Sequence, residues 1–200
     1  MKILHIDSSV TGEKSVSRPL SKETVARLQS LNPGAEVVYR DLVAEPLRHY
    51  TAVLRLFGAD LPDGTPEQKH ELAAGKEILA EFQAADVIVI GAPMYNFGIP
   101  SQLKAWFDLL CVPGVTFRYS SAGPEGLLGG RRVIVISTRG GLYGPGSPYE
   151  PADFQEKYIK QVFAFLGIPE VEIIRAEGIG RADKATAVLA AAKEQIANLT

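Results

Sequence analysis

Three loops carry the residues best suited to bind a ligand, and the first of them, residues 7–19, is rich in hydroxyl groups. Hydroxyls and free backbone amides at the start of a helix bind anions, and the helix dipole adds to the attraction. We therefore expect a phosphate to bind here. The hydroxyl groups belong to four serines, Ser8, Ser9, Ser15 and Ser17, and to Thr11. The alternative is that these residues only cap a helix and fill a turn, which serine often does.

The second loop, residues 92–100, combines apolar and aromatic side chains with one amide. Pro93 and Pro100 restrict its backbone, so the loop presents these groups in a fixed arrangement. This composition suits a flat, heteroaromatic ligand with polar edges. The predicted contacts are Pro93, Met94, Tyr95, Asn96 and Phe97. The alternative is a rigid turn whose aromatic rings fill the core, although the amide of Asn96 would then need a buried partner.

The third loop begins at Thr138 and contains the pair Gly140 and Gly141. Glycine lets the backbone approach a ligand closely, so the amides of this pair can bind a polar edge, while Thr138 adds a hydroxyl. The predicted contacts are therefore Thr138, Gly140 and Gly141. The alternative is a glycine-rich surface loop that binds nothing. Convergence of the three loops on one site would favour the binding interpretation for each of them.

Five short apolar runs, rich in β-branched residues, alternate with helical patterns along the chain, which indicates an α/β fold with a parallel sheet. The runs are 2–6, 36–39, 86–91, 132–138 and 171–175. The first, third and fourth are apolar at nearly every position, as in central strands covered on both faces. With right-handed crossovers, we expect residues 1–200 to form a single flavodoxin-like domain with a doubly wound, five-stranded parallel sheet of order 2-1-3-4-5 and helices on both faces. A ligand then binds where the strand order reverses, beside the three loops.

Helical spacing of apolar residues predicts which faces pack on the sheet. One predicted stripe comprises Leu20, Val25, Leu28 and Leu31, a second comprises Phe154, Tyr158, Val162 and Phe165, and a third comprises Val188, Ala192, Ile196 and Leu199. Thr65, Pro66 and Gln68 have the pattern of a capping box. They predict a helix that starts there and ends near Ala85.

Composition limits the classes of partner. The chain has 21 Lys and Arg against 23 Asp and Glu, with no basic run that would neutralise a nucleic-acid backbone, so we expect no nucleic-acid partner. Its apolar runs fall far below the ~20 residues that cross a bilayer, so we expect no membrane span. The single cysteine, Cys111, excludes an intrachain disulfide, and no secretion signal is visible, so a cytoplasmic protein is expected. The three histidines lack metal-ligand spacing, so no metal site is expected.

Several motifs resemble those of the FMN-dependent NADH:azoreductases, a family with a flavodoxin-like fold whose members are also NAD(P)H:quinone reductases. The motifs span nearly the whole chain and are Ser9 with Ser15–Ser17, Ala92–Phe97 with Gln102–Lys104, Gly114–Tyr119, Gly123–Leu127 and Arg139–Gly141. The resemblance implies that Ser9, Ser15, Val16 and Ser17 bind the phosphate of FMN. It also implies that Met94–Phe97 line one side of the isoalloxazine ring and that Thr138, Arg139, Gly140 and Gly141 hold its polar edge. The family usually has serine at the position of Thr138, which preserves the hydroxyl. A homodimer is also implied, in which each subunit contributes Tyr119 and Phe163 to the pocket of its partner.

The same resemblance implies an oxidoreductase that passes a hydride from NADH or NADPH to FMN and then reduces quinones, azo compounds or nitroaromatics in a ping-pong cycle. Because the flavin carries the redox chemistry, no catalytic side chain is expected. A flavodoxin-like electron carrier that binds FMN but reduces no small molecule is the main alternative, and a flavin-free module of the same fold is another. Carriers tend to be strongly acidic, so a net charge of only -2 and the extra segment 114–130 favour the enzyme.

Overall fold

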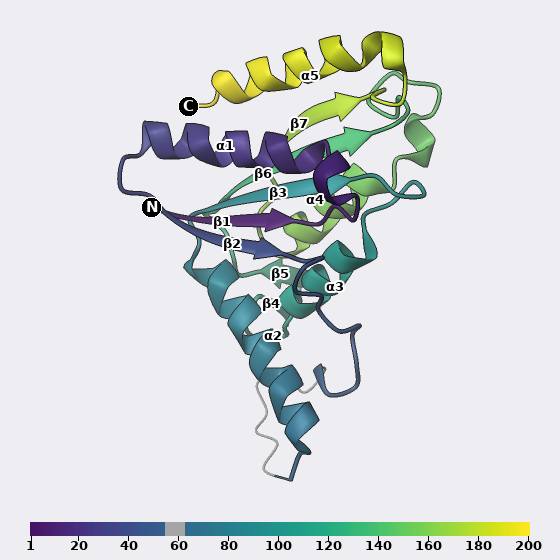
Figure 1. Ribbon diagram of the computed structural model, residues 1–200. Coiled ribbons are helices and arrows are strands. Elements are labelled where there is room, and N and C mark those ends of the chain that lie inside the picture. The colour runs from purple at the N-terminus through teal and green to yellow at the C-terminus, as the bar shows by residue number, and fades with distance from the viewer. Residues whose placement is uncertain (55–62) are drawn as a thin grey trace.

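The computed structural model describes residues 1–54 and 63–200 and has a five-stranded parallel sheet at its centre (Figure 1). The strands are β1 (Lys2–Asp7), β2 (Glu36–Asp41), β3 (Val87–Pro93), β6 (Arg132–Arg139) and β7 (Val171–Glu177). Their order is β2-β1-β3-β6-β7, and every neighbouring pair is parallel. This confirms the predicted fold, the order 2-1-3-4-5 and the central position of the first, third and fourth runs. The order reverses between β1 and β3.

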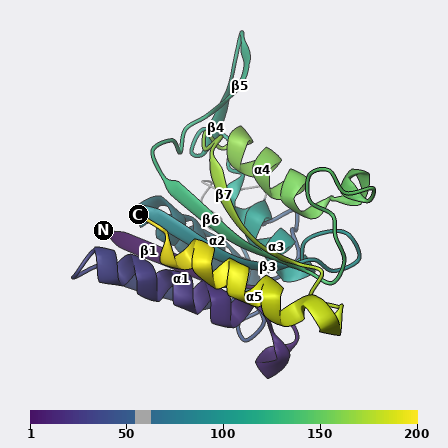
Figure 2. The same ribbon diagram turned by 90° about the horizontal axis from the view of Figure 1, so that it is seen from above.

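Two layers of helices cover the sheet (Figure 2). On one face lie α1 (Ser17–Leu31) and α5 (Ala182–Ala197), and on the other lie α2 (Pro66–Ala84), α3 (Ser101–Leu110) and α4 (Gln155–Phe165). Short 3-10 helices at η1 (Gly12–Lys14) and η3 (Glu150–Ala152) interrupt the loops. Alternate residues of each strand face the two layers, so that Ile3 of β1 packs with α1 whereas Leu4 and Ile6 pack with α2 and α3. No helix within the described ranges is long and apolar enough to span a membrane.

Local sequence signals place α1, α2 and α5 correctly. The predicted capping box is present at the start of α2, where the hydroxyl of Thr65 accepts a hydrogen bond from the amide of Gln68 at 3.3 Å. The predicted stripes of α1 and α5 pack on the same face of the sheet. Leu31 is the exception at 38% exposed, because it lies in the last turn of α1 beyond the edge of the core.

The stripe predicted for α4 is confirmed in part. Tyr158, Val162 and Phe165 are partly buried and pack against the core, whereas Phe154 does not. Asp153 Oδ1 accepts hydrogen bonds from two backbone amides, that of Gln155 at 3.1 Å and that of Glu156 at 2.9 Å. The helix therefore begins at Gln155. Phe154 precedes the helix and is 62% exposed. The helix also turns Phe163, which was not part of the predicted stripe, into the core. The side chains that are only half-buried are Tyr158, Val162 and Phe165.

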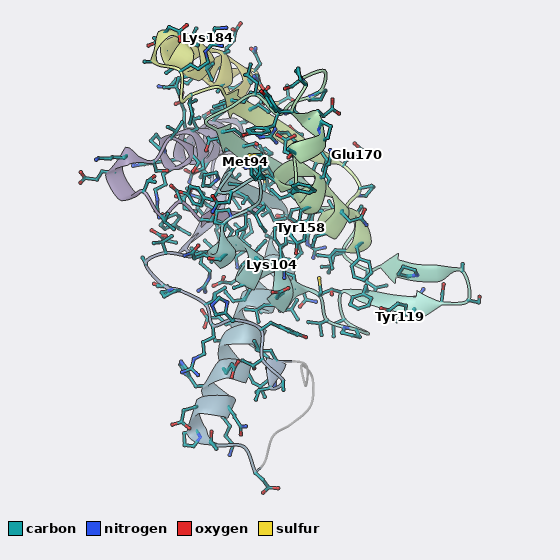
Figure 3. All side chains as sticks on the ribbon, turned by 90° about the vertical axis from the view of Figure 1, so that its right-hand side faces the viewer. Met94, Lys104, Tyr119, Tyr158, Glu170 and Lys184 are labelled. Carbon is teal, nitrogen blue, oxygen red and sulfur yellow. The ribbon has the colours of Figure 1, made fainter. Side chains whose placement is uncertain are left out.

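A short hairpin leaves the body of the domain and forms an arm (Figures 2 and 3). It consists of β4 (Phe117–Ser120) and β5 (Gly123–Gly126), which pair antiparallel. Tyr119 lies on this arm and is 75% exposed. At the base of the arm, a Cβ added to Gly126 would stand 2.0 Å from the nitrogen of Gly167. The arm therefore joins the domain through a contact that requires glycine.

Candidate functional site

The carboxyl ends of β1, β3 and β6 border a cavity of about 200 Å³, hereafter the strand-end hollow. Its wall contains residues from all three loops that the sequence singled out. The lining residues are Ser9, Thr11, Lys14, Val16, Pro93, Met94, Tyr95, Thr138, Gly140 and Ile179. In a doubly wound sheet, ligands bind at this reversal of strand order. The structure therefore brings the three loops together at the expected place.

Three polar contacts fix the three loops relative to one another. The hydroxyl of Tyr95 lies 3.3 Å from Ser9 Oγ and accepts a hydrogen bond from the amide of Val10 at 3.2 Å, which joins the second loop to the first. The amide of Met94 donates to the carbonyl of Thr138 at 2.8 Å, which joins the second loop to the third. The wall of the hollow is thus cross-linked by the protein itself.

A strained turn follows Tyr95. Asn96 and Phe97 have φ values of 48° and 71°, a region that costs free energy for residues with a side chain. Two reciprocal backbone hydrogen bonds of 3.0 Å between Tyr95 and Gly98 close the turn and hold it in this conformation. Phe97 is 51% exposed, so the alternative in which this loop fills the core is wrong. Asn96 and Phe97 lie next to the hollow but not in its wall.

The third loop presents two free backbone donors. Residues 178–180 donate hydrogen bonds to the carbonyls of Arg139, Gly140 and Gly141, with lengths of 3.2, 3.1 and 2.9 Å. The amides of Gly140 and Gly141 have no acceptor within the described part of the chain. A Cβ on Gly140 would meet nothing within 4 Å, so glycine leaves open space there. The sequence motifs did not select Ile179, because only the folded chain places the segment after the last strand behind the third loop.

The side chain of Arg139 does not line the hollow. It is 1% exposed, and its Nη2 atom lies 2.9 Å from Asp153 and 2.5 Å from Glu156. Its Nε atom donates to Gln155 Oε1 at 2.9 Å. Only the backbone of Arg139 is available to a ligand in the hollow, because the guanidinium is buried.

The predicted contacts of the first loop divide into two groups. Ser9 and Val16 line the hollow, whereas Ser15 and Ser17 do not. Ser15 Oγ accepts a hydrogen bond from the amide of Arg18 at 3.2 Å, so the capping alternative applies to this serine. Among the described residues, the amides of Val16 and Ser17 have no acceptor, which leaves the positive end of α1 open to an anion.

Two lining residues of the first loop were not selected from the sequence. The hydroxyl of Thr11 lies 3.0 Å from Ser9 Oγ, which groups two hydroxyls on one side of the hollow. Lys14 is the one cationic side chain among the described lining residues. A lysine in a surface loop carries no spacing signal, so geometry was needed to identify it.

A charge network beneath the first loop sets its position. Arg18 forms a two-pronged contact with Asp41 at 2.6 and 2.8 Å and also donates to the carbonyl of Ser9 at 3.0 Å. Hydrogen bonding by Arg18 holds the pKa of Asp41 below its ordinary value. Tyr39 donates to the buried carboxylate of Asp7 at 3.1 Å. Burial and then the charge of Asp7 raise the pKa of Tyr39 to about 12.

The two residues expected to reach a partner's pocket differ in exposure. Tyr119 is exposed on the arm, but Phe163 is 0% exposed and packs against Phe107 with a ring separation of 5.4 Å. The prediction for Phe163 is therefore wrong, because a ring inside the core cannot reach another subunit. Phe165, two residues later, is half-buried and lies 4.5 Å from the ring of Phe117 at the base of the arm.

A family model described as the flavodoxin-like fold matches residues 1–199. The chain belongs to this flavodoxin-like family. The flavodoxin-like chain is 52% identical over 198 residues to an FMN-dependent NADH:quinone oxidoreductase of Sinorhizobium fredii, covering 98% of this chain and 96% of that protein. It is also 52% identical over 203 residues to a protein of the same name from a Bradyrhizobium species, covering 100% and 99% of the two chains.

Solved structures of azoreductases share the flavodoxin-like architecture over its full extent. Azoreductase AzrA superposes with a TM-score of 0.89 and 29% identity, covering 98% of this chain and 97% of that one. An FMN-dependent NADH-azoreductase from Bacillus anthracis, in complex with FMN, superposes with a TM-score of 0.87 and 30% identity, covering 98% and 96%. The expected resemblance is confirmed.

Proposed function

We propose that this chain is an FMN-dependent NADH:quinone oxidoreductase that also reduces azo compounds. The observation that carries the proposal is the strand-end hollow, where an open helix start, an apolar and aromatic wall and two free glycine amides meet. The names of relatives at 52% identity support the cofactor, the electron donor and the acceptor class. They do not favour the electron-carrier alternative.

The first loop fits the phosphate of FMN. The free amides of Val16 and Ser17 lie at the positive end of α1, where an anion is stabilised by the helix dipole. Ser9 and Thr11 add hydroxyls and Lys14 adds a positive charge. Ser15 keeps a supporting part, because its hydroxyl holds the first turn of α1 in place.

The second and third loops fit the isoalloxazine ring. Pro93, Met94 and Tyr95 would line one face of the ring, with Asn96 and Phe97 at its margin. The amides of Gly140 and Gly141 and the hydroxyl of Thr138 would bind the pyrimidine edge, which is rich in acceptors and donors. The open space at Gly140 gives this edge room to approach the backbone. Arg139 takes part through its backbone.

In this mechanism, the role of the protein is to bind and orient FMN. Bound FMN would supply the redox chemistry, accepting a hydride from NADH and returning two electrons to the acceptor. Lys14 and Tyr95 are the titratable side chains among the described lining residues, and both lie in loops that anchor the flavin. The protons that the acceptor takes up therefore come from water in this proposal, and no side chain has to be an acid or a base.

The proposal includes a homodimer. Figure 3 shows Tyr119 on the arm, well away from Met94 of the same subunit, so Tyr119 would reach the flavin site of a partner and not its own. Phe165 replaces Phe163 as the second aromatic contribution, since it lies beside the base of the arm. Nitroaromatics join the acceptors because they are flat and can stack on the same open ring face. A cytoplasmic location is included because NADH is supplied there.

The test uses the purified chain. We expect the absorbance bands of oxidised flavin after loading with FMN, and NADH oxidation that depends on added benzoquinone or an azo dye. FMN binding without acceleration by any quinone, azo dye or nitroaromatic would replace the proposal with the electron-carrier alternative. A chain that binds no FMN would be a flavin-free module. The same assay with NADPH measures the preference between the two donors.

A further inference from the structure

Gln155 joins the second and third loops from inside the protein. Its side chain is 0% exposed, its Nε2 atom donates to the carbonyl of Ala92 at 2.6 Å, and its Oε1 atom accepts from Arg139 Nε at 2.9 Å. Ala92 is followed by Pro93, and Arg139 is followed by Gly140, both of which line the strand-end hollow. One amide at the start of α4 therefore links the two strand ends directly behind the proposed ring site.

Buried carboxylates fix the position of the Arg139 side chain, to which Gln155 is hydrogen-bonded. Its guanidinium contacts the buried carboxylates of Asp153 and Glu156. Glu177 lies 3.6 Å from Arg139 Nη1 and accepts hydrogen bonds from the amides of Tyr143 at 3.1 Å and Gly144 at 2.9 Å. The network consequently holds both ends of the third loop.

The ladder between β3 and β6 ends at the pair Pro93 and Thr138, so the two loops leave the sheet at that point. We propose that Gln155 is a positioning residue that sets the separation of these loops and thereby the fit of the isoalloxazine ring. The inference builds on the proposed function, because it needs the ring to lie between the loops. Because Gln155 is 0% exposed, it would touch neither flavin nor substrate.

The experiment compares the dissociation constants of FMN and riboflavin. Gln155→Met preserves the volume of the side chain and removes its hydrogen bonds to Ala92 and Arg139, together with a third that Oε1 accepts from Ser137 Oγ at 3.3 Å. We expect both constants to rise together by about tenfold, since the carbonyl of Ala92 loses the Gln155 donor and the loops shift. Arg139 Nε keeps its hydrogen bond to Ser137 Oγ at 3.1 Å, so the loss falls mainly on the link to Ala92. The ratio of the two constants reports the contribution of the phosphate and is expected to stay unchanged, because the hydrogen bonds of the Gln155 side chain go to β3 and β6 and none goes directly to the first loop.

Gln161→Met is the matched control, since Gln161 is exposed on the same helix and should leave both constants unchanged. Thermal unfolding of each variant separates a general loss of stability from an effect on the flavin site. A lower unfolding midpoint with wild-type dissociation constants would overturn the inference. A loss of affinity for FMN with unchanged affinity for riboflavin would also overturn it, because such a change would report on the contacts to the phosphate and not on those to the ring.

Gln155→Glu provides a second test if the methionine variant does not fold. The carboxylate still accepts from Arg139 but cannot donate to the carbonyl of Ala92. We expect the affinity for both ligands to fall, and wild-type affinity would show that the link to Ala92 is not required and overturn the inference. If the wild-type chain bound no FMN, the proposed function itself would fail. If the wild-type chain binds FMN and the Gln155 variants have wild-type dissociation constants, only the positioning role of Gln155 is overturned.

Discussion

The two ends of the strand-end hollow are supported by charge networks of different kinds. Beneath the first loop, the side chains of Arg18 and Asp41 are 20% and 19% exposed. Beneath the third loop, Arg139 is 0% exposed and its partners Asp153 and Glu156 are 7% and 4% exposed. Water screens the first pair, so it contributes little to stability, whereas removing one member of a buried pair leaves an uncompensated charge.

This difference matches what each end would have to do. A phosphate on a flexible ribityl chain can be held by several arrangements of hydroxyls and amides. The ring must sit in one orientation for hydride transfer, and a preformed site loses less conformational entropy on binding. We call the part of the hollow at the first loop the phosphate end and the part at the third loop the ring end. We infer that the conformation of the phosphate end adjusts when the ligand binds, whereas the conformation of the ring end is already fixed in the free protein.

The strongest way to break this comparison is to remove each arginine in turn. Arg139→Met should lower the free energy of unfolding by about 3–5 kcal/mol, because the carboxylates of Asp153 and Glu156 lose their buried partner. Arg18→Met should cost less than about 1 kcal/mol, since its pair is partly exposed. Urea denaturation measures both values. Similar losses in the two variants would contradict the distinction between the networks.

The ring end can also be blocked without disturbing the fold. Gly140→Val places a branched side chain in open space at a backbone conformation outside the left-handed region. We expect FMN affinity to fall by at least tenfold, about 1.4 kcal/mol, while the thermal midpoint changes little. Quenching of FMN fluorescence measures the binding. Wild-type affinity in this variant would place the ring elsewhere.

The phosphate end should respond to salt where the ring end does not. Lys14→Gln should weaken FMN binding roughly threefold at low ionic strength and leave riboflavin binding unchanged, and the effect should shrink near 1 M salt, where charges are screened within about 3 Å. Lys22→Gln is the matched control, because Lys22 is exposed in α1 and does not line the hollow. Titrations of both flavins at two salt concentrations test this.

The smallest expected effect concerns alkaline pH. The pKa of Tyr39 is raised from 10.0 to about 12, so the folded state retains the phenolic proton more tightly than the unfolded state. Its contribution to stability is complete below pH 10 and is lost as the pH rises towards 12. Tyr39→Phe should therefore reduce the loss of stability between pH 9 and pH 11, as measured by urea denaturation. An alkaline loss equal to that of the wild type would show that Tyr39 does not contribute.

The strands, their order and the meeting of the three loops could be predicted from the sequence because each signal is local. A strand covered on both faces is a continuous apolar run, as in β3, and the right-handed crossover rule then determines which loops meet. The glycine pair after β6 was likewise visible as a place where the backbone could approach a ligand. These features depend on residues that are adjacent in the chain.

The interior polar network could not be predicted in the same way. Arg139 beside two glycines resembles a ligand contact, and its true partners lie 14 to 17 residues later, at polar positions that are typical of a helix start. The cap formed by Asp153 also set the register of α4, which decided that Phe163 is buried and Phe165 is not. Both outcomes follow from three-dimensional contacts that sequence spacing does not encode.

The arm is attached where Gly126 meets Gly167, at a distance that admits a hydrogen atom but no methyl group. In evolutionary terms, Gly126 cannot be replaced, because the side chain of any other residue would force the arm away from α4. Ser121 and Ala122 at the tip are exposed and free to vary. Descendants of this gene can therefore lengthen or remodel the tip without disturbing the sheet. If the arm completes a partner's site, changes at its tip would first alter which electron acceptors the enzyme reduces.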